Sequence, residues 1–124
     1  MQVMNTILTV IGALLTALWG VAHLFPTKNV VKSFGDISKD NKQIITMEWI
    51  NEGATLIFLG SLVIISLIVT GAPVQYINFS VSVMLLVLSL ISLFTGFKVK
   101  FLPFKLCPII FTASAICLVI GSII

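Results

Sequence analysis

The chain has 124 residues, of which 59% are hydrophobic and only 9% are charged, with a formal net charge of +3. Ordinary soluble domains are about 45–50% apolar and about 25% charged, so these few charged side chains cannot cover the surface of a compact soluble protein. The composition therefore excludes a soluble enzyme, a nucleic-acid-binding domain and a disordered chain, and it predicts an integral membrane protein in contact with the lipid bilayer.

The first apolar stretch covers about residues 6–25. No lysine or arginine precedes it, whereas a secretory signal peptide begins with a basic segment, so we expect a retained first span. A polar segment follows over residues 26–43, and its apolar residues predict a short interfacial helix over residues 27–34. Ser38 or Asp40 is then a suitable N-cap for the next helix.

Three further apolar stretches follow, and each has the length that a membrane-spanning helix needs. They cover about residues 44–69, 76–97 and 106–124, with a tight turn at Gly71-Ala72-Pro73 and a short basic loop over residues 98–105. The sequence therefore predicts an all-α polytopic membrane protein. Residues 1–124 are expected to form a single integral membrane domain, a bundle of four transmembrane helices.

The positions of the lysines predict the orientation of this bundle. All seven basic residues are lysines, and they lie only in the segments between spans one and two and between spans three and four. Cytoplasmic loops of membrane proteins carry the excess of lysine and arginine. We therefore expect loops 26–43 and 98–105 in the cytoplasm and both termini outside. Because the lysines flank apolar spans, they indicate topology and no nucleic-acid partner.

The first span has one face of small and polar residues. Gly12, Thr16 and Gly20 recur at intervals of four, a spacing that lets the backbones of neighbouring helices approach closely. We expect these three to be helix-packing residues of the bundle. They are also the candidate contact if the chain forms a homodimer.

The residues capable of chemistry gather at one end of the first two spans. His23 closes the first span, with Trp19 one turn before it, and Glu48, Asn51 and Glu52 lie in the opening turns of the second. Antiparallel packing would bring all five to the same cytoplasmic end. Two glutamates one turn apart repel each other, and at membrane depth a carboxylate needs a partner. The sequence therefore predicts a ligand-binding or proton-accepting site at these five residues.

A simpler interpretation of the same residues is also open. Carboxylates are favoured in the first turns of a helix, so Glu48 and Glu52 could be solvated at the headgroup level and pair with loop lysines. Trp19 and Trp49 have the character of interface anchors. With a single histidine and no catalytic motif, the sequence offers no zinc-ligand spacing and no nucleophile. We therefore expect no metal, no cofactor and no catalytic activity of its own.

A family resemblance rests on the first half of the chain. The first span ends in Trp19-Gly20-Val21-Ala22-His23-Leu24-Phe25-Pro26, and after Phe34-Gly35 come Glu52-Gly53 and Leu56-Ile57-Phe58-Leu59-Gly60. This pattern resembles the small DoxX-like membrane proteins over roughly residues 8–62. The resemblance implies an accessory role, such as a subunit of a quinone-linked oxidoreductase, a stress-related membrane protein or a receptor-assembly helper. Such proteins commonly begin with a basic N-terminus, whereas the lysines here predict the opposite orientation.

Three functions follow from these observations. The first is a small accessory membrane protein that binds a lipophilic, quinone- or lipid-like ligand or a membrane partner through the His23 and glutamate cluster. The second is a dimeric proton- or cation-coupled transporter, with Glu48 or Glu52 as the coupling carboxylate. The third is a purely structural protein whose glutamates remain solvated.

Overall fold

The computed structural model describes all 124 residues, and it contains helices but no strands. Two short elements, α2 (Thr27–Ser33) and the 3₁₀ turn η1 (Gly96–Lys98), lie in the connections. The four long helices are apolar enough to cross a membrane, which fits a membrane protein and confirms the predicted all-α four-helix fold. They are α1 (Gln2–Leu24), α3 (Lys39–Thr70), α4 (Gln75–Phe94) and α5 (Leu102–Ile123).

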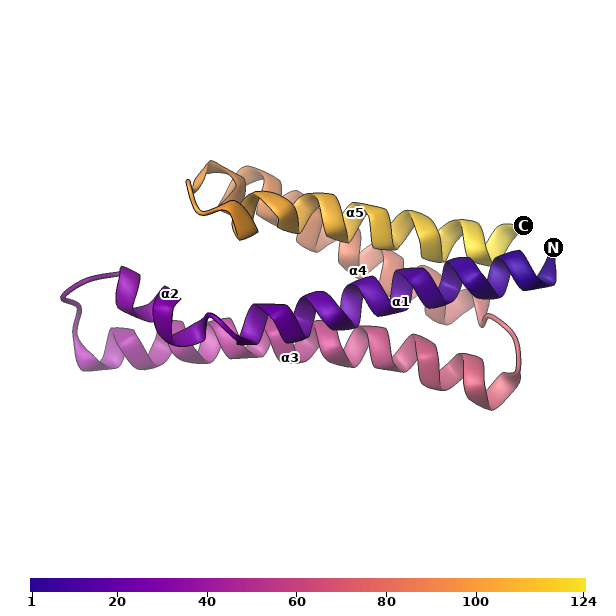
Figure 1. Ribbon diagram of the computed structural model, residues 1–124, viewed down its shortest axis with the longest axis horizontal. Helices are drawn as coiled ribbons and strands as arrows, with labels where there is room; N and C mark the ends of the chain where they lie inside the picture. Colours follow the sequence, from indigo (N-terminus) through magenta and orange to yellow (C-terminus); the bar gives the residue numbers. More distant parts are fainter.

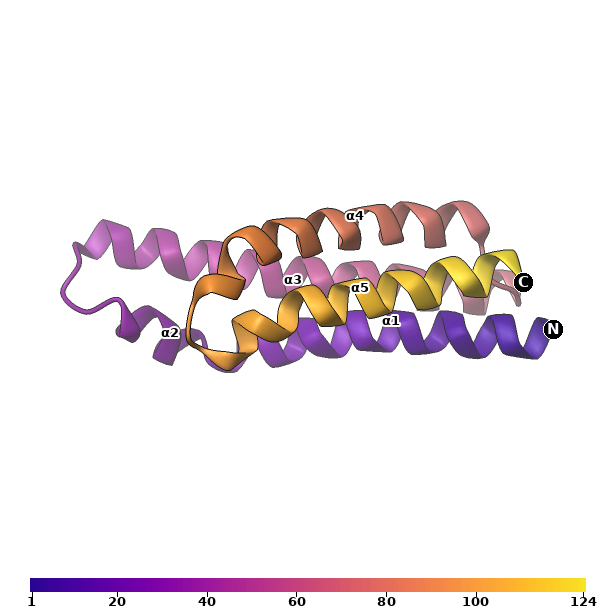
Figure 2. The same ribbon diagram turned by 90° about the horizontal axis from the view of Figure 1, so that it is seen from above.

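The four long helices form an open bundle with α1 and α5 at its centre. α1 packs against both α3 and α5, and α5 packs against α4 (Figures 1 and 2). α3 and α4 follow each other in the chain but make few contacts. The side of the bundle between α3 and α4 is therefore the loosely packed one.

The two ends of the bundle differ in charge. Both termini and the turn at Gly71 lie at one end, whereas α2 and the connection through η1 lie at the other (Figure 1). All seven lysines belong to the segments at this second end, which is called the lysine end below. Gly71 closes α3 with a left-handed backbone (φ 75°), a conformation that glycine adopts without steric cost. Ser38 caps the other end of α3 by accepting a hydrogen bond from the Asn41 N–H at 3.1 Å.

Small residues set the close spacing of α1 against its neighbours. A Cβ added to Gly20 would lie 2.7 Å from the carbonyl oxygen of Gly53, and one added to Gly12 would lie 2.9 Å from that of Ser114. Thr16 is fully buried between them and donates its hydroxyl proton to the Gly12 carbonyl oxygen at 2.9 Å. The face of Gly12, Thr16 and Gly20 is thus covered by α3 and α5 of the same chain. The suggestion that this face could form a homodimer contact is therefore wrong.

The bundle interior combines apolar packing with a few hydrogen bonds between helices. The Asn78 side-chain amide donates to the hydroxyls of Thr9 (3.2 Å) and Ser122 (2.9 Å), which links α4 to α1 and α5. Such bonds stabilise membrane helix pairs by roughly 0.6 kcal/mol on average. The five largest fully buried side chains of the bundle are aliphatic or aromatic, namely Phe111, Leu56, Leu85, Leu118 and Val63.

The fourth long helix begins earlier than the sequence pattern predicts. α5 starts at Leu102, within the segment expected to be a loop, and Pro103 occupies its first turn, where a missing N–H costs little. Pro108 consequently lies inside the helix and not in its first turn. The Ser89 hydroxyl donates to the Pro108 carbonyl oxygen at 3.0 Å, so α4 supports this part of α5.

Candidate functional site

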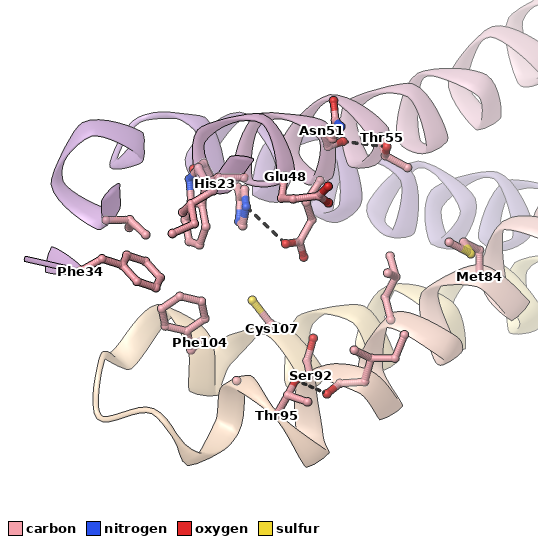
Figure 3. A pocket seen from close by; sticks show the side chains of 17 residues that line it. His23, Phe34, Glu48, Asn51, Thr55, Met84, Ser92, Thr95, Phe104 and Cys107 are labelled. Atoms are coloured by element: carbon pink, nitrogen blue, oxygen red, sulfur yellow. Dashed lines mark hydrogen bonds and ion pairs between the residues drawn. The ribbon is translucent and has the colours of Figure 1, made fainter. Parts of the chain in front are cut away.

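A cavity of about 550 Å³ opens at the lysine end, where α3 and α4 diverge. Seventeen residues from α1, α2, α3, α4, α5 and the connection after α4 line it, and nine of them are hydrophobic. Figure 3 shows side chains from the two halves of the chain facing each other across this space, with Cys107 and Phe104 opposite His23. The cavity is thus an apolar space with a small polar wall.

His23 and Glu52 form the polar wall and are the one pair of basic and acidic side chains of the chain that lie in contact. His23 Nε2 lies 3.4 Å from Glu52 Oε2, and the two side chains are 5% and 37% exposed. The contact is too long or misaligned to count as a hydrogen bond, so Nε2 is buried without a hydrogen-bond partner. A buried polar group in this state is costly unless another group, such as a water or a ligand, satisfies it. The pair therefore presents an unused hydrogen-bonding position to the cavity.

Trp49 holds His23 in place from the neighbouring helix. The two rings are stacked with centroids 3.9 Å apart and planes 16° from parallel. The Trp49 indole N–H also donates to the His23 carbonyl oxygen at 2.7 Å. This carbonyl lies in the last turn of α1, where carbonyl groups have no partner within the helix. Trp49 therefore provides a hydrogen-bond donor for a carbonyl group at the end of α1 and also fixes the position of the histidine ring.

Glu48 and Asn51 line the same cavity but are not joined to His23. Both residues are exposed, and neither side chain forms a hydrogen bond or an ion pair. The Asn51 side chain points away from the opposing helices (Figure 3). Its backbone carbonyl oxygen accepts a hydrogen bond from the Thr55 hydroxyl at 2.7 Å. The two glutamates thus differ: Glu48 is exposed and has no lysine partner, whereas Glu52 contacts His23.

Trp19 does not line the cavity. Its ring packs against the hydrophobic core of the bundle, and its indole N–H is buried without an acceptor. The sequence had suggested Trp19 for the site and treated Trp49 as an interface anchor, and the structure places Trp49 at the cavity instead. The signal for Trp49 was present, because it precedes Glu52 by three residues and so shares its helix face.

The second half of the chain supplies the opposite wall, which the sequence did not indicate. The Phe104 ring lies edge-on to Trp49 with centroids 5.5 Å apart, and the Cys107 thiol points into the space (Figure 3). Met84, Leu88 and neighbouring residues of α4 complete the apolar part. This opposite wall could not be predicted from the sequence, because nothing in the third and fourth apolar spans marks which of their sides faces α3.

The chemistry of the site is that of hydrogen bonding and apolar contact. The structure contains no group of three or more histidine, cysteine, aspartate or glutamate side chains placed to hold a metal ion. His23 can donate or accept one hydrogen bond through Nε2, and the Glu52 carboxyl group can do the same. The arrangement suits a molecule with a polar head and an apolar body.

Comparison of the chain with protein-family models, curated proteins and solved structures finds no match. The DoxX-like resemblance of the first half therefore stays a prediction.

Proposed function

We propose that this protein binds a lipophilic small molecule in the cavity between α3 and α4. The observation that carries the proposal is the buried, unpartnered Nε2 of His23, which faces Glu52 at the edge of a largely apolar space of about 550 Å³. That volume lies within the range of about 300–1,000 Å³ typical of small-molecule sites. A few placed polar groups among apolar walls are the usual composition of such sites.

The head group of the ligand is proposed to lie between His23 and Glu52. A carbonyl oxygen would accept a hydrogen bond from the histidine N–H, and a hydroxyl would donate to the carboxylate. A quinone supplies the carbonyl and the corresponding quinol supplies the hydroxyl, and the ring of either would lie near the Trp49 and Phe104 side chains. The isoprenoid or alkyl tail would follow Leu88 and Met84 between α3 and α4. Because this side of the bundle is loosely packed, the tail has a path toward the lipid.

The test uses a decyl-substituted benzoquinone and, as the headless control, decylbenzene, with the full chain in detergent micelles. We expect the quinone to raise the thermal midpoint of the protein in a concentration-dependent way, because a ligand that binds only the folded state stabilises it. Decylbenzene at equal concentration should have a much smaller effect. Equal stabilisation by the two probes would show simple partitioning and would contradict the proposal.

Two matched substitutions assign the effect to the polar wall. His23→Phe keeps an aromatic ring against Trp49 but removes both ring nitrogens, and Glu52→Gln removes the charge with little change in size. His23→Phe should weaken quinone binding by about tenfold, the equivalent of one hydrogen bond of about 1.4 kcal/mol. Glu52→Gln should weaken binding of the corresponding quinol by a similar factor, because a hydroxyl bonds more strongly to a carboxylate than to a neutral amide. Glu48→Gln makes the same charge change one turn away, and the affinity of this variant for the ligand should equal that of the unaltered protein. Unchanged quinone affinity of the His23→Phe variant and unchanged quinol affinity of the Glu52→Gln variant would refute the assigned roles.

The lysine end of the bundle is proposed to face the cytoplasm, with both termini outside. The support is the confinement of all seven lysines to one end of the structure, since excess lysine marks cytoplasmic segments. We expect a phosphatase reporter fused after Ile124, which is active only outside the cytoplasm, to be active. The same reporter inserted after Gly35, in the α2–α3 connection, should be inactive. The reverse result would invert the orientation and would agree with a DoxX-like topology.

A further inference from the structure

A second concave surface lies on the outside of the lysine end, between α2 and the first turns of α3. It has a volume of about 580 Å³, and its charged lining residues are Lys28, Lys32, Lys42 and Asp36. Asp36 forms no ion pair with any lysine, so it neutralises none of these three ammonium groups by direct pairing. The surface therefore has an uncompensated positive charge that favours an anion.

An apolar concavity adjoins this basic one. Its volume is about 620 Å³, and it shares Thr27, Lys28 and Thr46 with the basic concavity. Its remaining wall consists of the apolar Leu24, Phe25 and Ile50 together with Asn29. Phe25 is 84% exposed in the isolated chain, which is the state expected of a side chain that contacts lipid. A positively charged hollow thus continues directly into an apolar one.

The length of α3 places the two concavities at different depths. A helix of 32 residues is about 48 Å long, whereas the hydrocarbon core of a bilayer is about 30 Å thick. If the core begins near Thr70, it ends near Ile50, and Lys42 lies about 12 Å beyond it. The apolar concavity is therefore level with the edge of the hydrocarbon, and the lysines are level with the phospholipid headgroups.

We propose that these adjoining concavities bind one anionic phospholipid. Its phosphate lies among the ammonium groups of Lys28, Lys32 and Lys42, and the upper part of an acyl chain lies along Leu24, Phe25 and Ile50. A free phosphate ion would use only the basic half and would leave the apolar half without an occupant. This lipid site is separate from the His23–Glu52 cavity and does not depend on the ligand proposed there.

The chain offers a matched control for the lysines. Lys98 and Lys100 lie at the same end of the bundle but line neither concavity. Lys105 is unsuitable as a control because its ammonium group donates to the Phe97 carbonyl oxygen at 2.9 Å and lies over the Phe97 ring. Removing two lysines from either place changes the net charge equally, so a difference in lipid binding between the two double variants would require a specific lipid site.

Native mass spectrometry of the full chain in maltoside micelles, doped with phosphatidylglycerol or phosphatidylcholine of identical acyl chains, tests the proposal. We expect phosphatidylglycerol to bind about tenfold more tightly, with one molecule retained. The double substitution Lys28→Gln/Lys32→Gln should abolish this preference without changing phosphatidylcholine binding, which also shows that the variant is folded. The control variant Lys98→Gln/Lys100→Gln should keep the preference for phosphatidylglycerol.

Three results would overturn the proposal. Equal losses in the two double variants would show general attraction of anionic lipid to the charged end. Equal affinity of the unaltered chain for the two lipids would show that the lysines do not favour the anionic lipid. Displacement of phosphatidylglycerol by inorganic phosphate or glycerol phosphate at a similar concentration would show an ion site in which the acyl chain has no part.

Discussion

Gly60→Ala is expected to lower the free energy of unfolding by about 1–3 kcal/mol, the usual cost of overpacking a tight interior. An added Cβ would lie 2.5 Å from the Ala13 carbonyl oxygen and 2.7 Å from the Ala17 backbone nitrogen. Backbone atoms cannot move aside as a flexible side chain can, so α1 and α3 must separate. In a membrane this separation is costly because close van der Waals contact, more than water exclusion, holds the helices together.

The measurement is unfolding of the purified chain in mixed micelles with increasing sodium dodecyl sulfate, followed by circular dichroism. Gly96→Ala is the matched control, since its added Cβ would meet only the Phe104 side chain at 3.4 Å or more. This control substitution should change the free energy of unfolding by less than about 0.5 kcal/mol, as is usual for substitutions outside the packed core. Equal stability of the Gly60 and Gly96 variants would show that α1 and α3 are not packed as closely as described.

Phe111→Ala is expected to cost about 3 kcal/mol of unfolding free energy. The Phe111 ring is fully buried in α5 and belongs to the same core cluster as Leu56, Leu85 and Leu118. Truncation leaves a cavity in the middle of the bundle, and large-to-small changes of this kind cost about 3–5 kcal/mol in soluble proteins. The lower end applies here because the unfolded chain also keeps this ring in an apolar medium.

Phe58→Ala provides the comparison for this prediction. Phe58 is 63% exposed on α3, so its ring contacts lipid or detergent in both the folded and the unfolded state. Its removal should change the unfolding free energy by less than about 0.5 kcal/mol. Similar losses in both variants would mean that Phe111 is not part of the packed interior, and the proposed arrangement of α5 against the other helices would have to be abandoned.

The candidate site could be predicted only in part, and the two glutamates show why. Glu48 and Glu52 lie one turn apart on one helix face, so local spacing cannot distinguish them. The register between α1 and α3, set where Gly20 meets Gly53, places His23 beside Glu52 and leaves Glu48 exposed. The same register brings Trp49 under the histidine ring. Contacts of this kind depend on two helices at once.

The amino-acid sequence alone predicted the all-helical fold, the four long helices and the inward face of α1. Those properties depend on the length and periodicity of apolar residues within single segments, such as the buried Gly12, Thr16 and Gly20 of α1. The sequence did not predict which helices are neighbours, that the face of Gly12 is covered within the chain, or that Phe104 and Cys107 lie opposite His23; these follow from the folded structure. Because lipid solvates every apolar face equally well, the partner of each helix depends on close contacts between residues that are far apart in the sequence.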